Sequence, residues 1–197
     1  MKSTIKLAAL APALLLGGCL SFGGEAPDSL LTLTSTATVP AGAGAPMSQS
    51  NAIALVEFGS TKAIDVTRVP VQVTDTELAY LQDAVWVDRP ARLFGQLVAE
   101  TIRSRTGRMV VDGDDPGVGA IDRLHGTLRS FGYDARSRDV VVVFDAVRNG
   151  ASSSVTTRRF ESRVPVAAPE TAFVGPALNQ AANDVAGQIA DWVGQGA

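Results

Sequence analysis

Three successive stretches in the second half of the sequence limit the fold more than any other feature. Residues 139–148 hold four valines and a phenylalanine in a row, and such a run is typical of a central strand covered on both faces. Residues 122–130 alternate between apolar or small and polar side chains, and residues 152–164 are polar enough for an edge strand. Asn149–Gly150, a strong hairpin signal, joins stretches 139–148 and 152–164. The sequence therefore predicts antiparallel strands here.

Two amphipathic helices are also predicted. Apolar residues recur at helical spacing between Leu93 and Ile102. Asp88 is expected to cap the first turn of this helix, Pro90 stands near its first position, and Gly107 is expected to end it. A second set of apolar residues recurs at the same spacing near the end of the chain, at 178–193.

Shorter stretches complete the expected fold. Pro70 lies in one of them and suits an edge position, because proline cannot donate a hydrogen bond to a neighbouring strand. The pattern predicts an α+β fold, with a mostly antiparallel sheet and two amphipathic helices packed on one face. We expect a single domain over residues 29–197, with a flexible loop at about 35–50. The shorter predicted strands are 30–34, 52–58, 66–73, 76–80 and 108–111.

The amino terminus has the layout of an export signal. Lys2 and Lys6 precede the mostly apolar run 7–16, which is too short to span a bilayer, since a span needs about 20 residues. Leu16-Gly17-Gly18-Cys19 follows and resembles the lipobox of bacterial lipoproteins. We therefore expect a signal peptide at 1–18, a lipidated tether at 19–28, and a membrane anchor made only of lipid on Cys19.

The lipobox resemblance implies that Cys19 carries a diacylglycerol and an N-acyl chain, and no other cofactor is expected. Leu20 stands where aspartate would retain many such lipoproteins in the inner membrane. The expected location is therefore the periplasmic face of the outer membrane. Without Lys2 and Lys6 the chain keeps 15 of its 17 basic residues against 20 acidic ones, and this acidic balance argues against a nucleic-acid partner.

The sequence offers little for catalysis. His125 is the only histidine and is read as a surface residue, with a general base as the alternative. Asp112, Asp114 and Asp115 are read as an acidic turn, because Pro116 stands where a calcium loop needs an oxygen ligand. No nucleophile elbow, phosphate-binding loop or dinucleotide fingerprint is present. We expect no enzyme and no metal site, and a periplasmic hydrolase is the disfavoured alternative.

Aromatic and arginine residues supply the candidates for partner binding, because these residue types often anchor interfaces. Trp86, Tyr80 and Arg89 cluster just before the first helix and lie outside its apolar stripe. A core position is the alternative for Trp86, whereas Trp192 falls on the apolar stripe of the second helix and is read as core. Two arginine groups are read as solvated strand ends, with a lipid phosphate or an acidic partner as the alternative: Arg136–Arg138 and Arg158–Arg159.

Residues across most of the chain resemble one known family. Tyr80, Trp86 and Pro90 precede an amphipathic helix, and Asp191-Trp192-Val193 ends a second one. With the lipobox, this layout resembles the auxiliary lipoproteins of ABC-type transport systems, the PqiC-like family, over about residues 29–193. Leu30–Leu31 departs from the aromatic pair that the family often has in its first strand.

The resemblance implies a non-enzymatic periplasmic subunit of a lipid or hydrophobic-solute transporter. Its implied partner is a substrate-binding protein of the mammalian-cell-entry type, and the resemblance leaves a homo-oligomer open. The alternative interpretation is an envelope assembly or structural lipoprotein that is not tied to a transporter.

Overall fold

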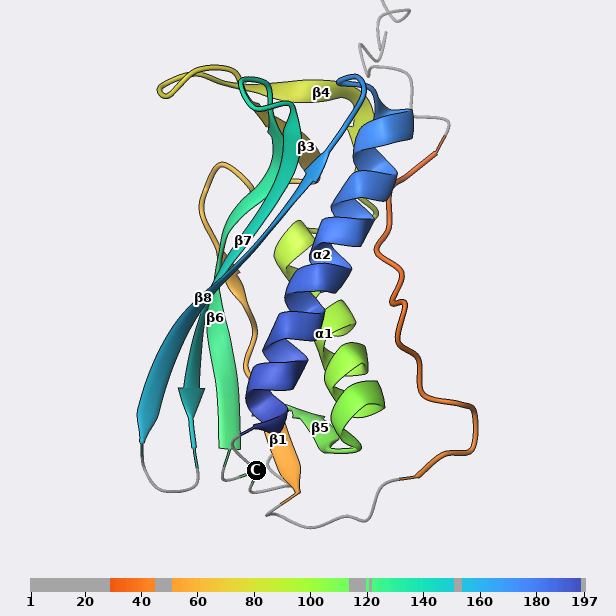
Figure 1. The fold of residues 1–197 in the computed structure, drawn as a ribbon, viewed down its shortest axis with the longest axis vertical. Helices are drawn as coiled ribbons and strands as arrows, with labels where there is room; N and C mark the ends of the chain where they lie inside the picture. The colour runs from red at the N-terminus through yellow and green to blue at the C-terminus, as the bar shows by residue number, and fades with distance from the viewer. Residues whose placement is uncertain (1–28, 45–50, 114–119, 121, 151–153, 196–197) are drawn as a thin grey trace, which may run out of the picture.

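The computed structural model describes residues 29–44, 51–113, 120, 122–150 and 154–195, and it has two layers (Figure 1). A long twisted sheet forms one layer, and two helices lie side by side along one of its faces. The helices are α1 (Pro90–Thr106) and α2 (Thr171–Gly194). The strands are β1 (Ala52–Leu55), β2 (Gly59–Ser60), β3 (Arg68–Gln72), β4 (Leu78–Val85), β5 (Met109–Asp112), β6 (Asp122–Asp134), β7 (Asp139–Asn149) and β8 (Val155–Pro165).

The eight-stranded sheet is mixed, so the prediction of a mostly antiparallel sheet was wrong. β6 lies antiparallel to β7, whereas β1, β2 and β3 all pair with β6 in the parallel direction. β5 is also parallel to β1, because the chain crosses over through α1 between them. Local hydrophobic patterns reveal strands but not the direction in which distant strands meet.

The three-stranded unit β6–β7–β8 agrees with the prediction. β7 pairs on both sides and β8 pairs only with β7, which confirms the central and edge positions. The Asn149–Gly150 hairpin is also confirmed, although its loop is longer than two residues: the Gly150 N–H donates to the Ser154 carbonyl at 3.0 Å. β6 continues past Ser130 to Asp134, beyond a register shift between Leu128 and Ser130.

Pro70 is not at an edge, because β3 lies between β4 and β6. A register shift between Arg68 and Pro70 accommodates the missing N–H in the pairing with β4. On the other side Pro70 packs against Gly132 of β6, where an added Cβ would lie 2.9 Å from Pro70 Cγ and nearer still to its carbonyl oxygen. Glycine at 132 thus allows proline inside the sheet.

Both helices form where predicted, with one change at each start. Gly107 ends α1 in the left-handed region at φ 66°, as expected. The N-cap of α1 is Arg89 rather than Asp88. The Asp88 carboxylate instead accepts the Arg89 N–H at 2.7 Å. α2 begins at Thr171, a full two turns before Leu178, and contains Pro176 near its start. Neither helix in the described ranges is long and apolar enough to cross a bilayer.

Aromatic side chains fill the space between the sheet and the helices. Trp86 packs on Phe131 with ring centroids 5.4 Å apart, and Phe144 packs on Phe94 at 5.3 Å. Trp192 is half-buried and its ring lies 5.6 Å from Phe160, so it supports the edge of this core as its position on the apolar stripe predicts.

The amino-terminal segment, residues 29–44, runs beside the two helices from the start of α2 toward the end of α1 (Figure 1). Its predicted strand at 30–34 is reduced to one bridge, between Leu31 and Trp86. Asn183 of α2 accepts the Thr36 N–H, and Glu100 of α1 accepts the Val39 N–H, both at 2.8 Å. The first part of the expected 35–50 loop is therefore tied to both helices, and residues 45–50 lie outside the described ranges.

Candidate functional site: a cavity and an open sheet face

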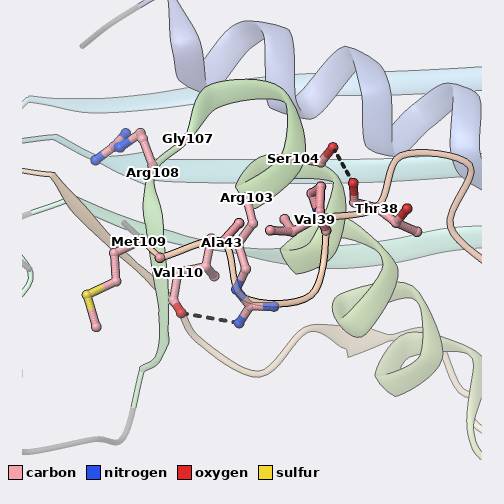
Figure 2. Close-up of a pocket in the computed structure, with 11 residues that line it drawn as sticks. Thr38, Val39, Ala43, Arg103, Ser104, Gly107, Arg108, Met109 and Val110 are labelled. Atoms are coloured by element: carbon pink, nitrogen blue, oxygen red, sulfur yellow. Dashed lines mark hydrogen bonds between the residues drawn. The ribbon is translucent and has the colours of Figure 1, made fainter. Parts of the chain in front are cut away.

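A cavity of about 520 Å³ lies where the amino-terminal segment passes the end of α1 and the edge of β5 (Figure 2). That volume is within the range of small-molecule sites, roughly 300–1,000 Å³. Most of its wall is apolar, and two of its polar side chains, Arg103 and Ser104, come from the last turns of α1. The lining residues are Thr38, Val39, Pro40, Ala43, Gly44, Arg103, Ser104, Gly107, Arg108, Met109 and Val110.

Hydrogen bonds to α1 and within a turn hold the outer wall of this cavity. The Ser104 hydroxyl donates to the Thr38 carbonyl at 3.3 Å, one residue before the Val39–Glu100 contact. The Ala43 N–H then donates to the Pro40 carbonyl at 3.1 Å, and Gly42 supplies the left-handed conformation, φ 84°, within this turn. These hydrogen bonds therefore fix the path of residues 38–43 along the cavity.

Arg103 is the exposed cation of the cavity, because Arg108, the other arginine in its lining, is buried against Asp122. Arg103 Nη2 donates to the Val110 carbonyl at 3.2 Å (Figure 2). Its Nη1 lies 3.6 Å from Glu100 Oε2. The side chain is 43% exposed, so part of the guanidinium reaches water at the cavity mouth. Sequence patterns missed this site, because its wall comes from a presumed flexible loop and a short strand that only the tertiary fold brings together.

A buried ionic cluster stands behind the cavity. Asp122 Oδ2 accepts from Arg108 Nη1 and from Arg148 Nη2, each at 2.7 Å, and all three residues are buried. Burial raises the pKa of Asp122, but the hydrogen bonds from Arg148 and Arg108 and their charges outweigh it and hold the pKa below its usual value. Arg108 also donates to the Ala52 carbonyl, so the cluster joins β1, β6, β7 and the residue just before β5.

The side of β6–β8 turned away from the helices, the open face, carries paired charges. Asp145 accepts from Arg159 Nε at 2.6 Å and from Arg129 Nε at 2.8 Å. Chiefly because of the hydrogen bond from Arg159, and in spite of partial burial, the pKa of Asp145 falls to about 2. Arg163 pairs with Glu161 on the same face. Along β8 the residues of this face alternate with residues of the helix side such as the buried Phe160. The open face therefore presents exposed guanidinium groups.

Loop 61–65 borders the open face and brings two predicted partner-binding residues together. The Tyr80 hydroxyl donates to the Ala63 carbonyl at 3.5 Å, and Arg89 Nη1 lies 3.4 Å from Asp65 Oδ1. A hollow of about 230 Å³ lies between this loop and the sheet, lined by side chains that include Ile64 and Arg129. Tyr80 is half-buried, with the Arg68 guanidinium over its ring at 4.4 Å, and Arg89 is exposed.

Trp86 does not share that surface. Its side chain is 2% exposed and belongs to the core, which was the alternative position for this residue. In an extended stretch successive side chains alternate, so Trp86 points inward while Val87 is exposed. The sequence alone did not show that Trp86 is buried while Tyr80 and Arg89, on either side of it in the chain, reach the surface.

The remaining candidates have no shared site. Half-buried His125 lies opposite Val147 in the sheet, and no group of metal-binding side chains occurs within the described ranges. Arg136 pairs with Asp134 and Asp75 at the turn after β6, as a strand-end arginine would. Arg158 lies over the Phe160 ring at 5.2 Å. Cys19, Asp114 and Asp115 lie outside the described residues, and Asp112 ends β5.

Solved structures with the same fold extend over most of this chain. A crystal structure from Xanthomonas campestris, of the DUF330 family, has a TM-score of 0.69 at 19% identity and covers 84% of this chain and 94% of its own. A crystal structure of an uncharacterized protein has a TM-score of 0.61 at 11% identity, with 85% and 98% covered. At these identities the likeness concerns the fold. No curated protein matches the sequence.

One protein family matches residues 31–190, which include both helices almost completely and every strand of the sheet. The match begins at Leu31, whose bridge to Trp86 starts the described fold, and it ends within the last turns of α2. The chain therefore belongs to the family of ABC-type transport auxiliary lipoprotein components.

Proposed function

We propose that this chain is a lipid-anchored, non-enzymatic periplasmic subunit that holds the mammalian-cell-entry-type protein of an ABC-type transporter of lipids or hydrophobic solutes. The observation that carries the proposal is the family match over residues 31–190. An auxiliary component of a transport system acts through a partner, and a lipid anchor on a tether would raise the local concentration of a binding face near the membrane.

The open face is the surface that we assign to this partner. It lies on the side of the sheet opposite the helices, and the amino-terminal segment runs along those helices (Figure 1). A partner could therefore cover the open face without displacing the segment that leads to Cys19. Arg129 and Arg159 share one carboxylate, Asp145, so this group carries a net positive charge in a chain with acidic balance. An acidic surface on the partner is its complement.

A pair of neighbouring arginines tests this assignment. Arg159 lies on the open face, whereas Arg158, the preceding residue of β8, lies on the Phe160 side. Tagged chains carrying Arg159→Gln or Arg158→Gln are used to co-purify the mammalian-cell-entry protein from envelopes in mild detergent. We expect Arg159→Gln to reduce recovery of the partner several-fold and Arg158→Gln to leave it unchanged. Arg89→Gln tests the border of the face at loop 61–65 in the same way.

Thermal melting of each variant checks that the fold is intact. Equal recovery with both β8 variants, at melting temperatures like the parent's, contradicts the assignment of the open face. Failure of the unmodified chain to recover any mammalian-cell-entry protein contradicts the proposed function itself and favours an envelope role apart from transport.

A further inference from the structure

We propose that the cavity beside α1 binds a single acyl chain that ends in an anionic head group. This assignment does not depend on the partner of the open face, since the cavity lies on the helix side of the molecule. The site joins two chemistries: a largely apolar wall, and the partly exposed guanidinium of Arg103. A hydrophobic pocket with few convergent polar groups is the usual form of a small-molecule site.

The apolar wall suits a flexible chain. Val39, Pro40 and Ala43 line the cavity from the amino-terminal segment, and Met109 and Val110 line it from β5. Met109 is half-buried and unbranched, so it adapts to a hydrocarbon chain of varying conformation. Burial of each methylene group against this wall stabilises the bound chain.

The edge of β5 favours hydrocarbon over a peptide strand. A peptide that adds to a sheet edge needs the outward carbonyl and N–H groups of that edge for its own backbone. β5 has only four residues, and the Val110 carbonyl already accepts from Arg103. An acyl chain has no such requirement. The same contact holds the guanidinium at the cavity, so it orders the head-group site in advance.

Arg103 determines the charge of the head group. A guanidinium has five N–H donors, and the Val110 carbonyl uses one at hydrogen-bond distance while Glu100 lies further away at 3.6 Å. A carboxylate or phosphate can accept from the others at the exposed mouth, where it stays partly hydrated. Neutral lipids of the same chain length lack this interaction and should bind more weakly.

Calorimetric titration tests the proposal on the full chain carrying Cys19→Ser, which removes the acceptor of its own acylation. The probes are palmitate, lysophosphatidylglycerol with one palmitoyl chain, and hexadecanol as the uncharged equivalent. We expect one of the two anions to bind at one site per chain, and Arg103→Gln to weaken it roughly tenfold or more while leaving hexadecanol unaffected. The stronger anion identifies whether the ligand is a free fatty acid or a lysophospholipid.

Two variants and a mapping experiment place the binding. Arg92→Gln is the matched control, because Arg92 lies on α1 but pairs with Asp88 away from the cavity. Ala43→Trp should fill the cavity and abolish binding. A diazirine-bearing palmitate should cross-link to residues 38–44 or 107–110, which locates the chain even if a variant fails to fold.

Three results overturn the proposal. Neither anion binds, or Arg103→Gln and Arg92→Gln weaken binding equally, or the cross-links fall outside the two cavity segments. Binding of an apolar peptide in place of both anions also overturns it and makes the cavity a protein-docking groove. None of these outcomes bears on recovery of the mammalian-cell-entry protein, so the two proposals fail separately.

Discussion

Trp86 is one of the largest fully buried side chains, so its substitution should cost much stability. It is 2% exposed and its ring packs on Phe131, so alanine would leave a large cavity between β4, β6 and the amino-terminal segment. We expect Trp86→Ala to lower the free energy of unfolding by about 3–5 kcal/mol, as measured by urea denaturation. A variant that unfolds at the parent's urea concentration would contradict the core position.

Trp86→Phe is the matched control. Within the described residues the indole Nε1 has no hydrogen-bond partner, so phenylalanine gives up no such bond and keeps most of the packing. Its cost should be well below that of alanine. A loss as large as that of Trp86→Ala would mean that the indole N–H has a polar partner after all.

Asp122 should couple stability to acid pH. Its folded-state pKa is lowered, so its contribution is complete above the ordinary aspartate pKa of about 3.9 and is lost as pH falls through the lowered value. Asp122→Asn removes the carboxylate that two buried guanidinium groups share and should cost about 3–5 kcal/mol at pH 7. Urea denaturation at pH 7 and pH 2.5 should show a smaller difference from the parent at the lower pH. An equal difference at both would contradict the ionic role.

For single residues, the sequence reveals the type of side chain but not the side of the strand to which it points. Trp86, Tyr80 and Arg89 were grouped because they are neighbours, yet only Tyr80 and Arg89 reach loop 61–65. The alternation of an extended stretch could have separated them, had its register been known. Arg103 carried no signal, because its place at the cavity depends on where residues 38–44 cross α1.

At the scale of elements, two glycines should respond oppositely to alanine. Gly95 lies inside α1, and an added Cβ would be 3.7 Å from Phe58, an ordinary contact. Gly95→Ala should therefore raise stability by about 0.5–1 kcal/mol. Gly132→Ala should lower it, because its Cβ would collide with Pro70 in the parallel pairing of β3 and β6. Thermal melting measures both, and stabilisation by Gly132→Ala would contradict the observed placement of β3.

Elements with long local patterns were predictable from the sequence, and distant pairings were not. β7, β8 and α1 follow from a continuous apolar run, a polar return strand and helical spacing between a proline and a glycine. The parallel pairing of β3 with β6 joins residues more than sixty positions apart, and β1 is only four residues long. Such contacts arise from global packing, which no short pattern encodes.

For the whole molecule, the path of residues 29–44 relates the anchor to the two proposed binding regions. The described chain begins beside the start of α2, and the cavity lies near the far end of the helices (Figure 1). Ser29 is ten positions after Cys19, and a fully extended chain of that length reaches about 33–36 Å. A lipid on Cys19 would thus hold Ser29, beside the start of α2, within about that distance of the membrane, with the cavity near the opposite end of the helices.

The last prediction concerns that anchor. Cys19 is the only cysteine, so a fatty acid linked through sulfur has no other acceptor in this chain. Growth with a clickable fatty acid should label the parent chain, and Cys19→Ala should remove the label, because cleavage and acylation both need the thiol. Density-gradient fractionation should place the labelled chain in the outer membrane, because position 20 holds leucine and not the aspartate that retains many such lipoproteins in the inner membrane. Label on Cys19→Ala, or none on the parent, would contradict the lipid anchor, whereas a labelled chain in the inner membrane would contradict only the location.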